Sequence, residues 1–513
     1  MRRNSGCCVI RWILLLAVME LAALAMYVPS RGDLTVESAL YPEKLLRLEW
    51  TGEEQIRHPL DRHRDQRCAA GMISYAVLTG CWLVALAWLA RSNGQLDRRR
   101  LMVILAGCAV VCVTLWGLPP TFSDDSYRYR FEGAQTIGGY NPYQVRPVEA
   151  ERICNKYPEL FYSTDFTWRP TIYGPTTEFC FGVNGLFGNT MLGLRAMLLA
   201  AEGLLLYVCA GLLRRRGRPT GWIVAVALCP LVIIETNLDA HIEMLPIALT
   251  LAALLALDRR AWAAAAALFA LAFNVKYLWP ALAAFLLLGR LARQKKLLAG
   301  AGVFLLATAA LWLPFLLMSW ADVKPKPGDW ATWLPLPIQR VIEAPLQFLE
   351  RYNFNATIYR YVADQFHPSS SWPKLIALVL LVAAVGTLIW RRRWRLDLED
   401  VILVLAAALL ISPTSYPWYF TWLAPGLIVL GRGDLWKRIG PPVWIVFFLA
   451  MTPASQEFLA GLFRGNRVEA KPFPALPWMI VAVVAPLLAA AFVRRLLRPR
   501  FGLTVVDVER DRD

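Results

Sequence analysis

Charged residues are scarce in this chain. Only 18% of the 513 residues are Asp, Glu, Lys or Arg and only four are histidine, whereas 57% are hydrophobic. This balance excludes an ordinary soluble globular protein. The polar stretches between the apolar runs are too short for a separate soluble domain, so we expect one multi-pass membrane domain over residues 1–513.

Common metal and nucleotide motifs are also missing. The ten cysteines are scattered, with no C-x-x-C pair and no zinc spacing, and many lie within apolar runs. We interpret them as small, buried apolar side chains. No glycine-rich nucleotide loop and no α/β region is visible, which argues against a nucleotide-binding site. We expect no cofactor, and no motif indicates a divalent metal.

The sequence does contain many apolar runs, separated by short arginine clusters. The net charge of +16 could suggest nucleic-acid binding, but the positive-inside rule accounts for basic clusters between membrane spans. With all clusters in the cytoplasm, the runs predict an all-α transmembrane helix bundle with about 14 spans in the plasma membrane. The predicted spans are 9–28, 70–90, 101–118, 190–212, 219–236, 243–257, 261–274, 277–290, 297–318, 373–390, 400–412, 418–431, 442–460 and 475–493.

The polar segments then gather on the non-cytoplasmic side. Residues 119–189 form a long first outer loop, in which we expect an amphipathic helix along the membrane surface, and residues 319–372 form a second outer loop. Residues 494–513 form a cytoplasmic tail. Because Cys154 and Cys180 both fall in the first outer loop, they could form a disulfide.

The most unusual segment is SDDSYRYRFEGAQTIGGYNPYQVRP (123–147). Its acids Asp124 and Asp125 directly follow an apolar run, where a carboxylate is costly unless it has a partner or a task. Capping of a helix N-terminus is one explanation, but capping leaves the interleaved aromatic and basic residues unexplained. Beside the two acids, the segment contributes the candidates Tyr127, Arg128, Arg130, Glu132 and Asn141.

Further polar patches lie at the same predicted surface, and each has a simpler interpretation. Aromatic residues anchor helices at the interface, a lone lysine can snorkel, and carboxylates with a histidine can bind a metal, although the spacing at 235–244 fits no zinc pattern. The alternative is a site for a sugar and an anionic headgroup. These patches contribute the candidates Arg169, Tyr173, Asp239, His241, Glu243, Lys276, Asn355, Tyr416 and Trp418.

The order of these motifs, S-D-D-x-Y-R-Y, N-P-Y, T-I-Y-x-P, A-H-I-acid, V-K and S-P-x-x-x-P-W-Y, resembles the bacterial polyprenol-phosphate-mannose-dependent mannosyltransferases of the GT-C superfamily. The resemblance covers most of residues 101–430. It implies a helix bundle with a long catalytic outer loop and an inverting sugar transfer from a lipid-phosphate donor. It also implies that an acid of that loop is the base, which matches Asp124 and Asp125, with Lys276 and Arg169 placed to contact phosphate.

Three residues depart from the pattern that the resemblance implies. Glu243 and Glu132 stand where an aspartate is expected, and Gly174 stands where a proline is expected. These changes keep charge or turn character, so the expected fold is unaffected, while the identity of the sugar stays open.

We therefore predict a membrane glycosyltransferase that moves a sugar, mannose by resemblance, from a polyprenyl-phosphate donor to a glycan or glycolipid on the non-cytoplasmic face. Asp125 is the preferred base and Asp124 the alternative, because neighbouring residues of a helix point apart. The other functions to be weighed are transfer of a different sugar, such as arabinose, and a transporter or flippase for a lipid-linked substrate. No nucleic-acid partner is expected.

Overall fold

The computed structural model describes residues 5–28, 39–41, 64–320, 372–392, 398–412 and 416–425. All of them belong to one unit, Met1–Leu430. These residues are helical and contain no strand, which confirms the all-α class for this part of the chain. Asn355, the tail 494–513 and nearly all of the predicted second outer loop lie outside the described residues.

Long apolar runs form the long helices, and prolines begin several of the short ones because proline suits the first helical turn. In chain order the helices are α1 (Ser5–Ala25), α3 (Arg64–Arg91), α4 (Arg98–Thr114), α5 (Asp125–Ile137), α6 (Glu151–Lys156), α7 (Pro158–Ser163), α8 (Pro175–Leu186), α9 (Met191–Arg215), α10 (Val224–Ala227), α11 (Pro230–Ile233), α12 (Met244–Asp258), α13 (Trp262–Phe273), α14 (Leu278–Arg293), α15 (Leu297–Trp320), α18 (Trp372–Arg392) and α19 (Leu398–Ile411). A π-helix covers Ile234–Leu238, and a 3₁₀ helix covers Pro417–Trp422.

Several of these helices can cross a membrane. Four described segments are long and apolar enough, and a fifth crossing results if the bent pair Thr220–Ala227 and Pro230–Leu238, which meet at 58°, is one span. Pro230 explains the bend, because proline removes a hydrogen bond from the helix. The predicted number of about 14 spans stays a prediction, since other apolar helices, such as Trp262–Phe273, are short. The four long segments are Ala69–Arg91, Arg98–Gly117, Met191–Arg215 and Leu297–Met318.

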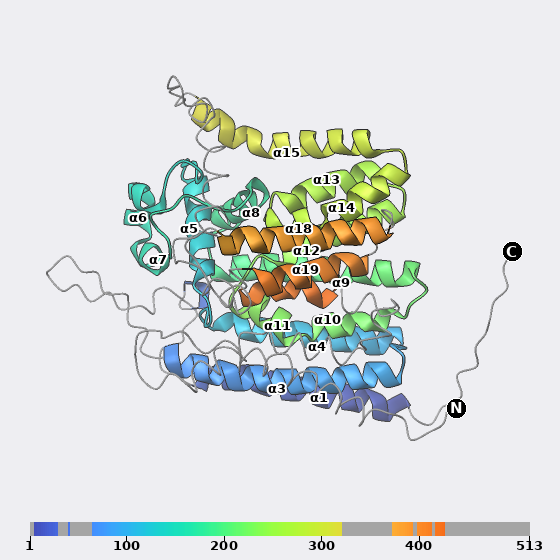
Figure 1. Cartoon of the computed structure of the whole chain (residues 1–513). Helices are drawn as coiled ribbons and strands as arrows, with labels where there is room; N and C mark the ends of the chain where they lie inside the picture. Colours follow the sequence, from blue (N-terminus) through green and yellow to red (C-terminus); the bar gives the residue numbers. More distant parts are fainter. Residues whose placement is uncertain are drawn as a thin grey trace. The chain divides into compact units, whose positions relative to one another are not determined.

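The long helices pack against one another, both between neighbours in the sequence and between separated segments such as α9 and α12. α12 contacts α9 and α13, α13 contacts α15, and α1 contacts α3 and α4. In Figure 1 the long helices run roughly parallel, and α5, α6, α7 and α8 lie together at one end of them. The segment between α4 and α9 therefore forms a helical layer at one end of the bundle.

This layer is the predicted first outer loop, and its apolar side chains pack in one cluster with residues of α9, α12 and α13. α5 packs against α8, and the rings of Tyr129 and Phe181 stack between them with centroids 4.8 Å apart. The opposite side of α8 exposes Val183 and Leu186. An apolar exposed side is expected of a helix that lies along a membrane surface, which remains a prediction for α8.

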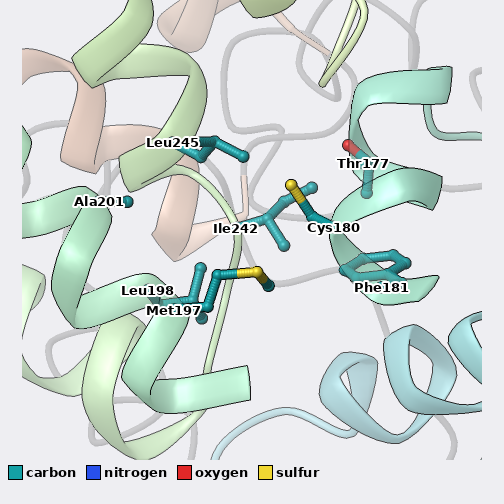
Figure 2. Close-up of a pocket in the computed structure, with 8 residues that line it drawn as sticks. All are labelled: Thr177, Cys180, Phe181, Met197, Leu198, Ala201, Ile242 and Leu245. Carbon is teal, nitrogen blue, oxygen red and sulfur yellow. The ribbon is translucent and has the colours of Figure 1, made fainter. Parts of the chain in front are cut away.

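The proposed disulfide between Cys154 and Cys180 is wrong, because both thiols are free in the structure. The Cys154 thiol donates a hydrogen bond to the carbonyl oxygen of Pro147 at 3.2 Å. Cys180 instead lines a small, mainly apolar pocket between α8, α9 and the turn before α12, and Figure 2 shows its thiol there with Ile242 and Met197. A shared outer loop is therefore not sufficient to pair two cysteines, since they must also lie within bonding distance.

The start of α8 docks onto the turn between α13 and α14. The Gly174 amide donates to the carbonyl of Val275 at 3.2 Å, and the Thr176 amide donates to the carbonyl of Asn274 at 3.0 Å. The two backbones are so close that a Cβ added to Gly174 would lie 2.1 Å from the Asn274 carbonyl oxygen. Glycine is thus required at position 174, where the sequence pattern implied proline. The same contact places Lys276 beside the start of α8.

We expect Gly174→Ala to destabilise the protein by about 1–3 kcal/mol, the usual cost of forcing extra volume into a packed contact. Thermal unfolding of the purified protein measures the change. The matched control is Gly203→Ala in α9, where an added Cβ meets nothing within 4 Å and alanine is the better helix former. Equal stability of the two variants would contradict the required contact.

Candidate active site

The N-terminus of α5 presents Asp125 to the site. Asp124 occupies the N-cap without a capping hydrogen bond from its side chain, and Asp125 is the first helical residue. The Ser123 hydroxyl accepts a hydrogen bond from the Asp125 amide at 3.3 Å. The Asp125 carboxylate accepts one from the Tyr129 hydroxyl at 3.4 Å. The Ser123 hydroxyl thus accepts from the first amide of α5, and the Asp125 carboxylate is available to face the site.

An irregular segment between α11 and α12 brings a second set of acids to Asp125. The π-helix Ile234–Leu238 carries Glu235, and Ala240 has φ +59°, a backbone conformation that non-glycine residues rarely adopt. The His241 ring follows, with Nδ1 2.9 Å from Glu235 Oε2 and Nε2 3.8 Å from Asp125 Oδ2. Nε2 also lies 3.0 Å from the Ser123 hydroxyl oxygen.

The cation of the site comes from the turn between α13 and α14. The Lys276 ammonium forms an ion pair with Glu243, whose side chain is 1% exposed. The same ammonium lies over two aromatic rings, 4.7 Å from the centroid of Tyr419 and 5.8 Å from that of Tyr173. Aromatic faces attract a cation, so Lys276 is held at a defined position.

Aromatic side chains line the remaining sides. The rings of Tyr416 and Trp418 stack at 4.5 Å with an interplanar angle of 3°, and Trp418 stacks on the His241 ring at 4.0 Å. Tyr173 contacts Tyr129 edge to face at 5.4 Å. Flat aromatic surfaces of this kind can pack against the apolar faces of a sugar ring, while the tyrosine hydroxyls supply hydrogen bonds.

Burial and neighbouring charges shift the pKa values of Asp125 and His241, which face each other. Burial raises the pKa of Asp125, and the positive charges of Lys276 and of His241, when His241 is protonated, oppose that rise. Burial lowers the pKa of His241, against the attraction of Asp125 and Glu243. A carboxylate with a raised pKa is a stronger base, and 26% of the Asp125 side chain remains exposed, so a substrate hydroxyl can reach it.

Other predicted residues of α5 make contacts within the layer of α5 to α8 and do not face Asp125. Arg128 pairs with Glu132 at 2.6 Å and donates to the carbonyls of Phe166 and Arg169, both at 2.8 Å. Arg130 donates to the carbonyl of Asn189 at 2.8 Å. Tyr127 is buried in the adjoining apolar cluster. The structure thus places these side chains within the protein, and their role in binding stays a prediction.

Three more predicted residues join separate segments of the chain. Asn141 donates to the carbonyl of Phe315 in α15 at 2.8 Å. Asp239 accepts hydrogen bonds from the amides of Thr121 and Phe122 at 2.7 and 3.0 Å. Arg169 is buried, with its guanidinium 4.1 Å from the centroid of the Trp168 ring. Asp239 therefore positions the approach to α5, and the predicted contact of Arg169 with phosphate is not tested.

Two comparisons show what the chain is similar to. The family model described as "Alpha-(1->6)-mannopyranosyltransferase, N-terminal domain" matches residues 50–294, a range that includes Asp125, His241 and Lys276. "Alpha-(1->6)-mannopyranosyltransferase A" of Mycobacterium tuberculosis (strain ATCC 25618 / H37Rv) is 28% identical over 397 residues, which cover 69% of this chain and 71% of that relative. These similarities support a mannosyltransferase of the GT-C type. No solved structure matches the chain.

The motif resemblance and the prediction of a glycosyltransferase are thereby confirmed. The structure adds residues that were not among the candidates. Arg195 of α9 donates to the carbonyls of Trp116 at 2.7 Å, Leu118 at 2.8 Å and Leu238, and an arginine inside an apolar run was a usable signal. Tyr419 ends the S-P-x-x-x-P-W-Y motif and Glu235 lies in the acidic patch 235–244, but neither was selected as a candidate, because their contacts depend on the local backbone.

A second buried acid pair of the transferase lies between α5 and α8. The Thr171 hydroxyl donates to Glu178 at 2.7 Å, and Glu178 neighbours Glu132. Burial and the charge of Glu132 raise the pKa of Glu178 well above its usual range, so the pair is stable with one carboxyl protonated. The pair links α5, which carries Asp125, to α8, which carries Phe181.

Among the described residues, the one group of side chains close enough to bind a metal ion is Cys108, Cys112 and Glu202. It lies on α4 and α9, whereas the acids and the lysine above come from α5 and from the turns at 239–243 and 274–277. The Cys108 thiol donates to the carbonyl of Ala227 at 2.9 Å, so it has a hydrogen-bond partner as a protonated thiol.

Proposed function

We propose that this mannosyltransferase is an inverting enzyme that moves mannose from a polyprenyl-phosphate donor to a glycan or glycolipid acceptor. The observation that supports it best is a basic carboxylate, Asp125, and a cation, Lys276, facing one aromatic-walled site. The printed name of the mycobacterial relative supports mannose as the transferred sugar. Asp124 lies one residue earlier, at the N-cap, so we assign the role of base to Asp125.

In the proposed reaction, Asp125 removes the proton from the acceptor hydroxyl as the oxygen attacks the anomeric carbon. The bond between that carbon and the phosphate oxygen breaks, and the leaving phosphate keeps the electron pair. Lys276 stabilises the negative charge on the phosphate. Attack from the side opposite the leaving group inverts the anomeric carbon.

We further propose that the site faces the non-cytoplasmic side of the plasma membrane. Glu243 and Lys276 directly precede α12 and α14, whereas the arginine pairs Arg214–Arg215 and Arg290–Arg293 end α9 and α14. Basic clusters favour the cytoplasmic side. A site at the opposite ends of these helices is therefore expected outside, where lipid-linked donors are available and nucleotide sugars are scarce.

A transfer assay with the purified protein tests the proposal. We expect transfer from polyprenyl-phosphate mannose, little from polyprenyl-phosphate arabinose, and none from a nucleotide-linked mannose without a polyprenyl carrier. In sealed proteoliposomes, proteins whose 119–189 segment faces the added acceptor should be the active ones. Turnover with the nucleotide-linked sugar alone would refute the lipid donor.

A further inference from the structure

The reaction above uses Asp125 and Lys276 and leaves Glu235 without a role, although the backbone around it is unusual. The π-helix Ile234–Leu238 and the left-handed Ala240 (φ +59°) interrupt an otherwise regular approach to α12. Single π turns and strained residues persist mainly where function requires them. Here they fold the chain back, so that the His241 amide donates to the Glu235 carbonyl at 2.7 Å and the two side chains meet.

The contacts of the imidazole define its tautomer. Nδ1 lies 2.9 Å from Glu235 Oε2, although the two atoms form no aligned hydrogen bond. An ionised carboxylate can only accept and favours a proton on the nearer nitrogen, so we assign the ring proton to Nδ1. Nε2 then carries the lone pair and accepts the hydrogen bond from the Ser123 hydroxyl at 3.0 Å. Stacking on Trp418 fixes the plane of the ring. Asp125 Oδ2 lies 3.8 Å from the same nitrogen, so a small shift would bring the carboxyl group within hydrogen-bond distance of Nε2.

We propose that Glu235 and His241 act as a positioning pair for Asp125, in which Glu235 fixes the neutral tautomer of His241 and His241 takes the proton that Asp125 has removed from the acceptor. The proposal deepens the proposed function and rests on it. In a serine-hydrolase triad, an acid orients a histidine toward a reacting hydroxyl. Here Glu235 would orient His241 toward the Asp125 carboxylate instead.

The proton balance is complete without another reactant. Asp125 gains the acceptor proton during sugar transfer. Its protonated oxygen then closes from 3.8 Å to hydrogen-bond distance of His241 Nε2, in place of the Ser123 hydroxyl, and passes the proton to that nitrogen. The imidazolium is stabilised by the Glu235 carboxylate at Nδ1 and later releases the proton to water. Asp125 is thereby returned to its ionised form before the next acceptor binds.

Several charges face the imidazole and set its pH response. They are Asp125 of α5, Glu235 of the π-helix, Asp239 and Glu243 of the same turn, and Lys276 of the neighbouring turn. A nearby negative charge stabilises the protonated forms of both His241 and Asp125. Removing the charge of Glu235 therefore lowers the pKa values of both groups. The acid limb of the rate profile should therefore move to lower pH.

The test is Glu235→Gln, which keeps the shape of the side chain and removes its charge. With polyprenyl-phosphate mannose as donor, we expect the plateau of kcat to fall about 10- to 100-fold, less than the roughly 10²–10⁴-fold contribution of a general base itself, because Glu235 acts through His241. The acid limb should move to lower pH, and the KM for donor should stay unchanged. Glu235→Asp should recover part of the rate, and Glu159→Gln on α7 is the control expected to match the wild type.

Three results would overturn the proposal while leaving the transferase activity in place. They are a Glu235→Gln plateau and acid limb equal to those of the control, a fall in kcat without movement of the limb, and a Glu235→Asp variant as slow as Glu235→Gln. If Glu235→Gln does not fold, His241→Asn carries the same prediction, because asparagine retains a donor toward Glu235 but lacks Nε2. A wild-type protein that transfers no mannose would refute the proposed function itself.

Discussion

Asp125→Asn is expected to lower the single-turnover rate of sugar transfer by about 10²–10⁴, the usual contribution of a positioned general base. Asparagine keeps the shape of the side chain and its hydrogen bond from Tyr129, so the loss should come from the missing basic oxygen. Donor affinity should change little, because the carboxylate addresses the acceptor hydroxyl. Rate and donor affinity are measured on the same preparation.

Asp124→Asn is the matched control for this experiment. Asp124 lies at the N-cap and makes no capping hydrogen bond with its side chain, so its replacement should cost much less than that of Asp125. Near-normal turnover in both variants would remove the catalytic role from the pair and return it to helix capping. A larger loss from Asp124→Asn would transfer the role of base to Asp124.

Lys276→Ala is expected to weaken donor binding about 10- to 100-fold, since hydrogen bonds to charged groups contribute about 1.5–3 kcal/mol. The rate of transfer should fall as well if the contact strengthens while the phosphate leaves. Equilibrium binding of polyprenyl-phosphate mannose and single-turnover rates separate the two effects.

The control must account for Glu243, which is buried and loses its cation in Lys276→Ala. An unpaired buried charge is strongly destabilising, so the double variant Lys276→Met/Glu243→Gln, in which both charges are removed, should fold better and still bind donor weakly. Lys156→Ala is a second control, because Lys156 also lies over a tyrosine ring, 5.1 Å from the centroid of Tyr157, but in α6. Tight donor binding by the double variant would exclude Lys276 as the phosphate contact.

The sequence predicted the helical class and the segments that meet at the site, because apolar runs and motif order depend on composition along the chain. It did not predict which side chain of each motif turns inward. Asp239 and His241 are two residues apart, yet Asp239 binds the backbone before α5 while His241 faces Asp125. That division results from the π-helix and from the left-handed Ala240, for which the sequence carries no pattern.

The same limit applies to the arginines and to the spans. Arg128 was a candidate for substrate contact, but the carbonyls that it binds belong to a loop nearly 40 residues later, and such partners depend on tertiary structure. The bend at Pro230 divides a run that was predicted as one span. Hydropathy measures length and apolarity, whereas bends and short helices depend on how neighbouring helices satisfy the backbone.

The Arg195 contacts have a consequence for the biogenesis of the protein. This guanidinium lies in an apolar helix, where an unpaired charge is costly in lipid, and its acceptors come from both sides of it in the chain. Trp116 and Leu118 are synthesised before α9, but Leu238 is synthesised 43 residues after Arg195. Until the ribosome has delivered that segment, α9 lacks one of its acceptors, so its stable insertion is coupled to the arrival of the segment that also carries Glu235 and precedes His241.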